Sequence, residues 1–248
     1  MWGRSENVSS HRTLPPPQER PTSFDCPQDD KSRIAANPAY VETLDAYLER
    51  LAADAAVPGG GSAAALVASF GAALTAMVAR IARRNPKNSS STEALDTIVE
   101  RSDALRVELA DARLRDEVAF AAVVAAQALP KQTEAEKMMR RQAVDDALAR
   151  AAAEPLRATA LSLNVLELLE KLLEFPIQAL RSDVGSAAEF ASAALASCAY
   201  NVRINHRFMH DPEVVVWQEE ALCEREVAAQ GILTRVRARL GHAIGDSV

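Results

Sequence analysis

The apolar residues of this chain recur every three or four positions through most of its length, which is the spacing of one face of an α-helix. The first such run contains Val41, Leu44, Tyr47 and Leu51. The two-residue alternation of a half-buried strand is nearly absent, and the one Val-rich stretch, 214–216, fits better at the start of a helix. The pattern predicts an all-α protein, a compact bundle of about seven helices.

Proline, glycine and capping residues set the expected helix ends. Asn37–Pro38 combines an N-cap residue with proline at the first helical position. Ser90–Glu93 and Thr133–Glu136 both have the spacing of a capping box. Pro155 removes one backbone hydrogen bond, so a kink or a break is expected there. The expected helices span about residues 38–57, 62–84, 90–129, 133–154, 156–175, 184–205 and 212–240.

Residues 1–36 differ in composition from the rest of the chain. They are rich in Pro, Ser, Gln and charges of both signs, and they show no periodic apolar face. Such a segment buries too little apolar surface to offset the entropy of ordering. We expect a disordered tail at 1–36 and a single helical domain at 37–248.

Small side chains supply much of the apolar content, because aromatic residues make up only 4% of the chain. Alanine-rich helices approach one another closely, which predicts tight packing. No charged residue occurs from Ser62 to Ala79, a span close to the length that crosses a membrane. That span consists mostly of Ala, Gly, Ser and Thr, which contribute little insertion energy. A helix buried in the bundle is expected, without a membrane partner.

Charge and cysteine usage narrow the class of function. The formal net charge is −6 and no long basic stripe is present, so nucleic acid is not an expected partner. The three cysteines, Cys26, Cys198 and Cys223, are widely spaced and form no CxxC pair, which favours a reducing cytoplasm over a disulfide framework or zinc site. His206 and His210 are four apart but lack a third ligand at diagnostic spacing, so no metal is expected.

Three clusters of residues are candidates for chemistry, and the first is PGGGSAAAL, which begins at Pro58. Gly59, Gly60, Gly61 and Ser62 precede a strongly apolar helix. Glycines at a helix start expose backbone N–H groups at the positive end of the helix dipole, which suits an anion or a carbonyl oxygen. The alternative is a tight turn that allows close helix packing.

The second cluster is SDVG, with the helix that follows it. Ser182 and Asp183 stand at the helix start, and polar residues recur every four positions further along, which predicts a shared polar face. This face consists of Glu189, Ala193, Ser197, Asn201 and Asn205. It either forms a hydrogen-bond network or dimer contact, or lines a pocket in which Asp183 is an acid or base.

The third cluster runs from Asp116 to Lys131. Asp116 opens an almost uncharged helix that ends at Leu129–Pro130, and Lys131 follows in a loop, where it is a candidate to meet a carboxylate. An aspartate on a helix is usually solvated, but the apolar run that follows this one makes it a candidate.

Together these clusters resemble the cyclodeaminase and cyclohydrolase family of folate enzymes. That family includes the C-terminal domain of formiminotransferase-cyclodeaminase and the stand-alone bacterial methenyltetrahydrofolate cyclohydrolases. The matching motifs are PGGGSAAAL, then D-x-x-AF and ALPK within residues 116–131, then SDVG and NVRIN within residues 182–205. They occur in the family's order and cover roughly residues 40–215.

The resemblance implies an all-helical homodimer in the cytoplasm that acts on one-carbon tetrahydrofolates and needs no further cofactor. Asp183 and Asp116 are the implied catalytic residues, and Asn201 and Asn205 hold the pterin or the reacting nitrogens. Gly59, Gly60, Gly61, Ser62, Lys131 and Ser182 are further candidates for substrate contact. The basic clusters near residues 80–87 and 137–141 are candidates for the glutamate tail.

Three functions remain open at this level. The first is hydrolysis of 5,10-methenyltetrahydrofolate to 10-formyltetrahydrofolate. The second is release of ammonia from 5-formiminotetrahydrofolate, which gives the methenyl form. The third is a non-catalytic helical dimer or scaffold with the same fold.

Overall fold

The computed structural model describes residues 42–244, with side chains to residue 241. The expected tail at 1–36 and the expected helix start at Asn37–Pro38 lie outside the described residues. Within the described part the chain is all-α, as predicted, and contains no strand. The α-helices are α2 (Leu44–Leu51), α3 (Gly60–Arg83), α4 (Thr92–Gln127), α5 (Glu134–Leu172), α6 (Arg181–His206) and α7 (Pro212–Ile244), and the 3₁₀ helices are η2 (Pro86–Ser91) and η3 (Gln178–Leu180).

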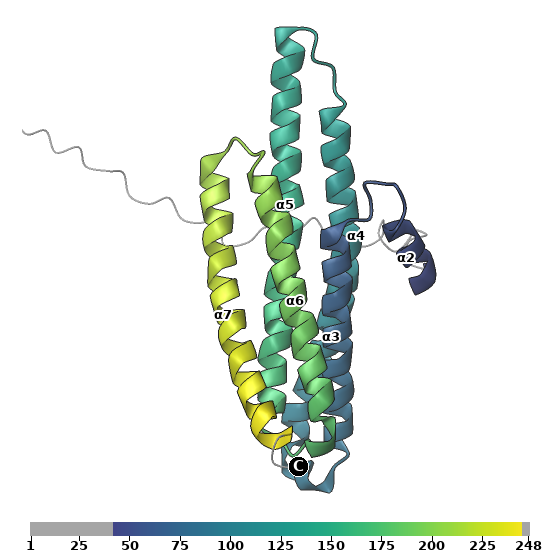
Figure 1. Ribbon diagram of the computed structural model, residues 1–248, viewed down its shortest axis with the longest axis vertical. Helices are drawn as coiled ribbons and strands as arrows, with labels where there is room; N and C mark the ends of the chain where they lie inside the picture. The colour runs from purple at the N-terminus through teal and green to yellow at the C-terminus, as the bar shows by residue number, and fades with distance from the viewer. Residues whose placement is uncertain (1–41, 245–248) are drawn as a thin grey trace, which may run out of the picture. The chain divides into compact units, whose positions relative to one another are not determined.

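Helices α3 to α6 form a four-helix core in which successive helices run in opposite directions, and α7 packs against α5 and α6 (Figure 1). The buried centre of this core contains Val78, Leu109, Leu166 and Leu195 among many smaller residues. Helices α4 and α5 continue past the ends of the other helices to the loop at 128–133 (Figure 1). The start of α3 therefore lies partway along α4, beside long helices that continue beyond it.

Helix α3 is the buried helix that the sequence predicts. By length and composition it could cross a membrane, but 61% of its most apolar window is buried inside the bundle. Its small residues bring it close to α6: a Cβ atom added to Gly71 would lie 3.1 Å from the carbonyl oxygen of Ala187. Alanine-rich composition thus produces close helix packing, as expected.

The sequence predicts a kink or a break at Pro155, and the break is wrong, because α5 runs through this position as one helix of 39 residues. This leaves six α-helices in the described part of the chain where about seven were expected. Pro155 cannot donate a hydrogen bond to the carbonyl of Ala151, four residues earlier. The side chain of Asn205 on α6 supplies that bond, because its Nδ2 atom donates to the Ala151 oxygen at 3.1 Å.

This arrangement predicts a coupled effect on stability. Asn205→Ala is expected to lower the free energy of unfolding by about 1–3 kcal/mol, because a buried carbonyl loses its donor. In a Pro155→Ala background the new backbone N–H at position 155 can reach that carbonyl, so the same substitution should cost less. Urea unfolding of the four proteins measures the coupling, and strictly additive effects would contradict the assignment.

The start of α4 also differs from the prediction, whereas the start of α5 agrees with it. The box at Thr133–Glu136 is present with both of its reciprocal bonds. The box expected at Ser90–Glu93 does not form, since residues 86–91 make η2 and α4 begins at Thr92. Within η2, the buried side-chain amide of Asn88 donates to the carbonyl of Ala82 at 2.8 Å, which connects this turn to the end of α3.

Candidate functional site

The first turn of α3 is a point of close contact between helices. We call Gly59–Gly61 the glycine corner. None of its glycines has a positive φ, so a left-handed backbone is not the reason for them. A Cβ atom added to Gly61 would lie 2.2 Å from Oδ1 of Asp116, and one added to Gly60 would lie 3.2 Å from Nδ2 of Asn201. The glycines therefore admit an aspartate from α4 and an asparagine from α6.

Asp116 is a half-buried carboxyl group beside this corner. Burial raises its pKa to about 6, and the charges of Glu154 and Glu117 act in the same direction, while a hydrogen bond from the backbone N–H of Ser62 opposes them. A carboxyl group with this pKa exists in both protonation states near neutral pH. It is therefore suited to accept a proton and return it within one reaction.

Besides α4 itself, the helices α3, α5 and α6 contribute groups around Asp116, and Ser62 is the group from α3. Glu154 on α5 is held by Arg115, whose Nε atom lies 2.9 Å from the glutamate. Cys198 on α6 is completely buried, and burial together with the charge of Asp116 raises the pKa of its thiol to about 12. Cys198 is therefore a neutral thiol at physiological pH and unsuited to act as a nucleophile.

Ser62 belongs to a second network, which faces α2. Its hydroxyl donates to Glu117 at 3.0 Å and also bonds to the phenol of Tyr47 at 3.0 Å. Arg50 donates to the other oxygen of Glu117 at 3.0 Å, and the guanidinium of Arg113 lies 4.7 Å from the centre of the Tyr47 ring. Of these residues the sequence pointed only to Ser62. The others lie 15 or more positions away or carry no motif of their own.

The two asparagines of α6 have different surroundings. Asn201 is half-buried, and its Nδ2 atom donates to the carbonyl of Ser197 at 2.8 Å. Asn205 is buried and donates to the backbone carbonyls of Ala151 and Asn201. Asn201 therefore borders the glycine corner, whereas the amide of Asn205 is bound to helix backbone.

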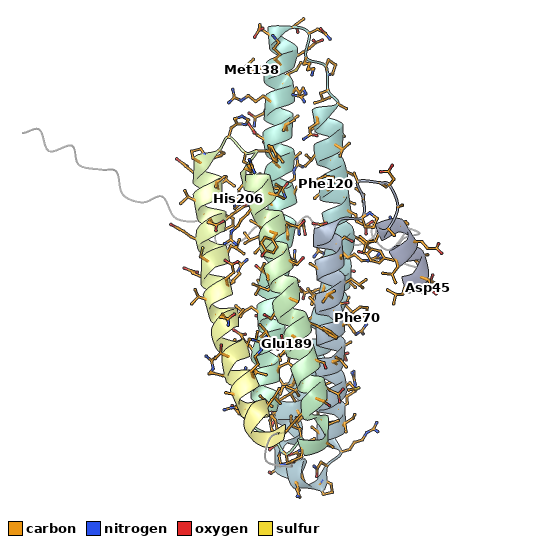
Figure 2. The ribbon with its side chains drawn as sticks, viewed as in Figure 1. Asp45, Phe70, Phe120, Met138, Glu189 and His206 are labelled. Carbon is orange, nitrogen blue, oxygen red and sulfur yellow. The ribbon has the colours of Figure 1, made fainter. Side chains whose placement is uncertain are left out.

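The prediction that the polar residues of α6 share one face is wrong. Glu189, which Figure 2 labels, is exposed and pairs with Arg237 of α7 at 2.7 Å. Asn205 is buried and bonds to the backbone of α5. The reason is geometric, because each step of four residues overshoots a full turn by roughly 40°, which amounts to roughly 160° over four steps. The residues spiral around the helix instead of lying along one side.

Three predicted residues lie away from the glycine corner within one chain. Ser182 and Asp183 are in the first turn of α6. Asp183 precedes Asn201 by 18 residues (201 − 183), which is about 27 Å along a helix. Lys131 is exposed in the loop beyond the end of α4. One chain thus brings together Asp116, Asn201, Ser62 and the glycine corner.

The basic cluster at the far end of α3 is already partly neutralised. Arg80 pairs with Asp103, and Arg83 pairs with Asp96 at 2.8 Å. With Arg84, these arginines line a surface cavity of about 540 Å³. Because Arg80 follows Gly60 by 20 residues (80 − 60), the cavity lies about 30 Å from the glycine corner.

The two histidines bind to separate partners. His206 contacts Gln218 at 2.8 Å, and His210 contacts Asp145 at 2.8 Å. Among the described residues, no group of three or more His, Cys, Asp or Glu side chains is arranged to hold a metal ion.

Comparison with known proteins decides the family. The family model for formiminotransferase-cyclodeaminase matches residues 43–224. The chain belongs to this family. The match includes every helix that contributes to the glycine corner and its surroundings, and it confirms the resemblance inferred from the sequence motifs.

Two relatives and one solved structure place the chain within the family. It is 36% identical over 185 residues to the methenyltetrahydrofolate cyclohydrolase of Methylorubrum extorquens, and the aligned region covers 75% of this chain and 88% of that protein. It is 30% identical over 169 residues to the formimidoyltransferase-cyclodeaminase of Rattus norvegicus, and the aligned region covers 68% of this chain but 31% of the rat protein. The crystal structure of the formiminotetrahydrofolate cyclodeaminase of Thermotoga maritima has a TM-score of 0.75 and 28% identity, with 82% of this chain and 98% of that chain covered.

Proposed function

We propose that this protein is a folate one-carbon enzyme that hydrolyses 5,10-methenyltetrahydrofolate to 10-formyltetrahydrofolate. The observation that carries the proposal is the carboxyl group of Asp116, which is pressed against the glycine corner and has a pKa of about 6. The similarity to the cyclohydrolase of Methylorubrum extorquens over 88% of that protein supports the choice of reaction.

The proposed chemistry requires one group that holds a proton between two steps. The bridge carbon of the methenyl substrate is part of a cation, and the ionised carboxylate of Asp116 attracts it. Water adds to this carbon as Asp116 accepts one of its protons. Asp116 then returns that proton to N5 as the bond between N5 and the carbon breaks, and the hydroxyl proton leaves to solvent as the formyl group forms. In this proposal Asn201, which lies beside Gly60, holds the pterin ring.

The cyclodeaminase reaction is the second candidate, and the structural similarity to the Thermotoga maritima protein favours it. In this reaction N10 attacks the formimino carbon, and ammonia leaves after it receives a proton. The same carboxyl group can take the proton from N10 and deliver it to the leaving nitrogen. The third candidate, a non-catalytic dimer, predicts neither reaction.

A paired assay separates the three candidates. The purified protein is mixed with 5,10-methenyltetrahydrofolate in one cuvette and with 5-formiminotetrahydrofolate in another, and methenyl absorbance is followed. A cyclohydrolase lowers the absorbance in the first, and a cyclodeaminase raises it in the second. Absence of both changes would leave the non-catalytic dimer.

We further propose that the protein is a homodimer and that its second subunit covers the outer face of α3 and α6. Large apolar side chains are exposed on these neighbouring helices: Phe70, which Figure 2 labels, is 42% exposed, Phe190 is 39% exposed and Tyr200 is 73% exposed. A second copy related by a two-fold axis near the level of Phe190 would bring the partner subunit's Asp183 toward the glycine corner, because Phe190 lies two residues from position 192, the midpoint between Asp183 and Asn201 on α6. The expected compartment is the cytoplasm, since the described cysteines are free thiols.

Complementation tests the shared site. Asp116→Asn and Asp183→Asn are each expected to be inactive as purified homodimers. When they are unfolded together and refolded, half of the dimers are mixed and each has one intact site, so about a quarter of wild-type activity should return. Full activity of the Asp183→Asn variant alone would remove Asp183 from the site, and a monomer in sedimentation would contradict the dimer.

A further inference from the structure

We propose that Glu117 and Tyr47 are positioning residues that act through Ser62 to hold the first turn of α3 against Asp116. The two neighbours on α4 thus have different tasks: Asp116 meets the substrate, while Glu117 fixes the backbone that Asp116 contacts. The importance of this role for turnover rests on the proposed function. The positioning itself does not depend on which reaction is catalysed.

The direction of the hydrogen bonds follows from the protons available. A serine hydroxyl has one proton, and that of Ser62 is donated to the carboxylate of Glu117 at 3.0 Å. In the contact of 3.0 Å with Tyr47, Ser62 must therefore accept, and the phenol donates. Burial raises the pKa of Tyr47, which keeps the phenol protonated. The Ser62 side chain is completely buried and bonded on both sides, so it is closed to substrate.

Glu117 is itself fixed by two arginines. Arg50 of α2 donates to its Oε2 atom at 3.0 Å, and Arg113, one turn earlier on α4, lies 3.8 Å from its Oε1 atom. Arg113 also lies over the ring of Tyr47, so the carboxylate, the phenol and the guanidinium hold one another in place. Helix α2 is thereby attached to the bundle at the glycine corner.

Ser62 connects this network to the candidate active site. Its hydroxyl is anchored by Glu117 and Tyr47, while its backbone N–H donates to the carboxylate of Asp116. If the hydroxyl loses its anchor, the first turn is free to move away and the N–H bond to Asp116 weakens. Because that bond stabilises the ionised form, its loss raises the pKa of Asp116. The other groups that face Asp116 are Glu117 on α4, Glu154 on α5 and Cys198 on α6.

Ser62→Ala and Tyr47→Phe test the proposal because neither changes a charge. We expect each to lower kcat by about tenfold or more while KM changes less than about threefold. The acid limb of the pH profile should move to higher pH. Ser62→Thr, which keeps the hydroxyl, should recover most of the rate. Ser162→Ala is the matched control, because Ser162 is equally buried but bonds only to the carbonyl of Ala158 in its own helix.

A second readout is independent of turnover. The carboxyl carbons of aspartate are labelled with ¹³C, the Asp116 signal is assigned from its loss in Asp116→Asn, and its titration is followed by NMR. Ser62→Ala and Tyr47→Phe should raise the titration midpoint by about half a pH unit or more relative to wild type and to Ser162→Ala. An unchanged midpoint in both variants would overturn the positioning role. If wild type turns over neither folate, the proposed function fails, but this titration still decides the positioning role.

Discussion

Asp116→Asn is expected to lower kcat by about a thousandfold while KM stays within a few-fold of wild type. The substitution keeps the shape of the side chain and an oxygen that accepts from Ser62, but it removes the group that carries the proton. Proton transfer by a positioned side chain typically contributes factors of about 10² to 10⁴. Steady-state kinetics with the better of the two folate substrates measures the loss.

Asp103→Asn is the matched control for this result. Asp103 is an aspartate of the same helix, paired with the exposed Arg80 far from the glycine corner. It should retain at least half of the wild-type rate. An Asp116→Asn variant with more than about a tenth of wild-type kcat would show that another group carries the proton.

The Asp116→Asn substitution should make the folded protein more stable at neutral pH. Burial raises the pKa of Asp116 to about 6 in the folded protein from the ordinary aspartate value of 3.8, so ionisation is less favourable in the folded state. Wild-type stability therefore falls as pH rises through the window between these values, by up to about 3 kcal/mol. Urea unfolding should show Asp116→Asn more stable at pH 7.5 and the difference gone near pH 3.5. An equal difference at both pH values would contradict the folded-state pKa.

Gly61→Ala is expected to reduce activity by about a hundredfold, although it introduces only one methyl group. The new Cβ atom would lie 2.2 Å from one oxygen of Asp116 and 2.9 Å from the other, so the carboxylate has to move. A displacement of about 1 Å at a catalytic group costs rates of this order. The kinetic parameters and the ¹³C titration of Asp116 should both change.

Gly59→Ala and Gly60→Ala provide a graded comparison within the glycine corner. A Cβ atom on Gly59 would meet only a carbonyl oxygen at 3.8 Å, which is ordinary contact, so this variant should keep wild-type activity. A Cβ atom on Gly60 would lie 3.2 Å from Asn201, which predicts an intermediate loss. Equal losses in all three variants would indicate that backbone flexibility, and not close approach, is what the glycines provide.

Local sequence signals predicted most of the fold. Apolar periodicity located the helices, and the box at Thr133–Glu136 gave the start of α5 correctly. The prediction of a break at Pro155 failed because the carbonyl that lacks a backbone donor there accepts a hydrogen bond from Asn205, a residue 50 positions away on another helix. The local sequence around Pro155 does not show that a side chain of another helix donates to this carbonyl.

The candidate site was predictable only in part from local features. Three adjacent glycines before an apolar helix left open a ligand at exposed N–H groups or a tight turn for close helix packing, and within one chain the groups that approach them are the side chains of Asp116 and Asn201. The network of Tyr47, Ser62 and Glu117 was not predictable, because it joins three helices through side chains far apart in sequence. The polar spacing on α6 misled for the opposite reason, since a repeat of four drifts around a helix with 3.6 residues per turn.

The most direct test of the account is the ¹³C titration of Asp116 with and without bound 10-formyltetrahydrofolate, the proposed product. If the folate binds at the glycine corner, it excludes water from the carboxyl group, and the titration midpoint should rise from about 6 when the protein is saturated. A folate that binds, as judged by its own NMR signals, yet leaves the Asp116 resonance and midpoint unchanged would show that the substrate lies elsewhere.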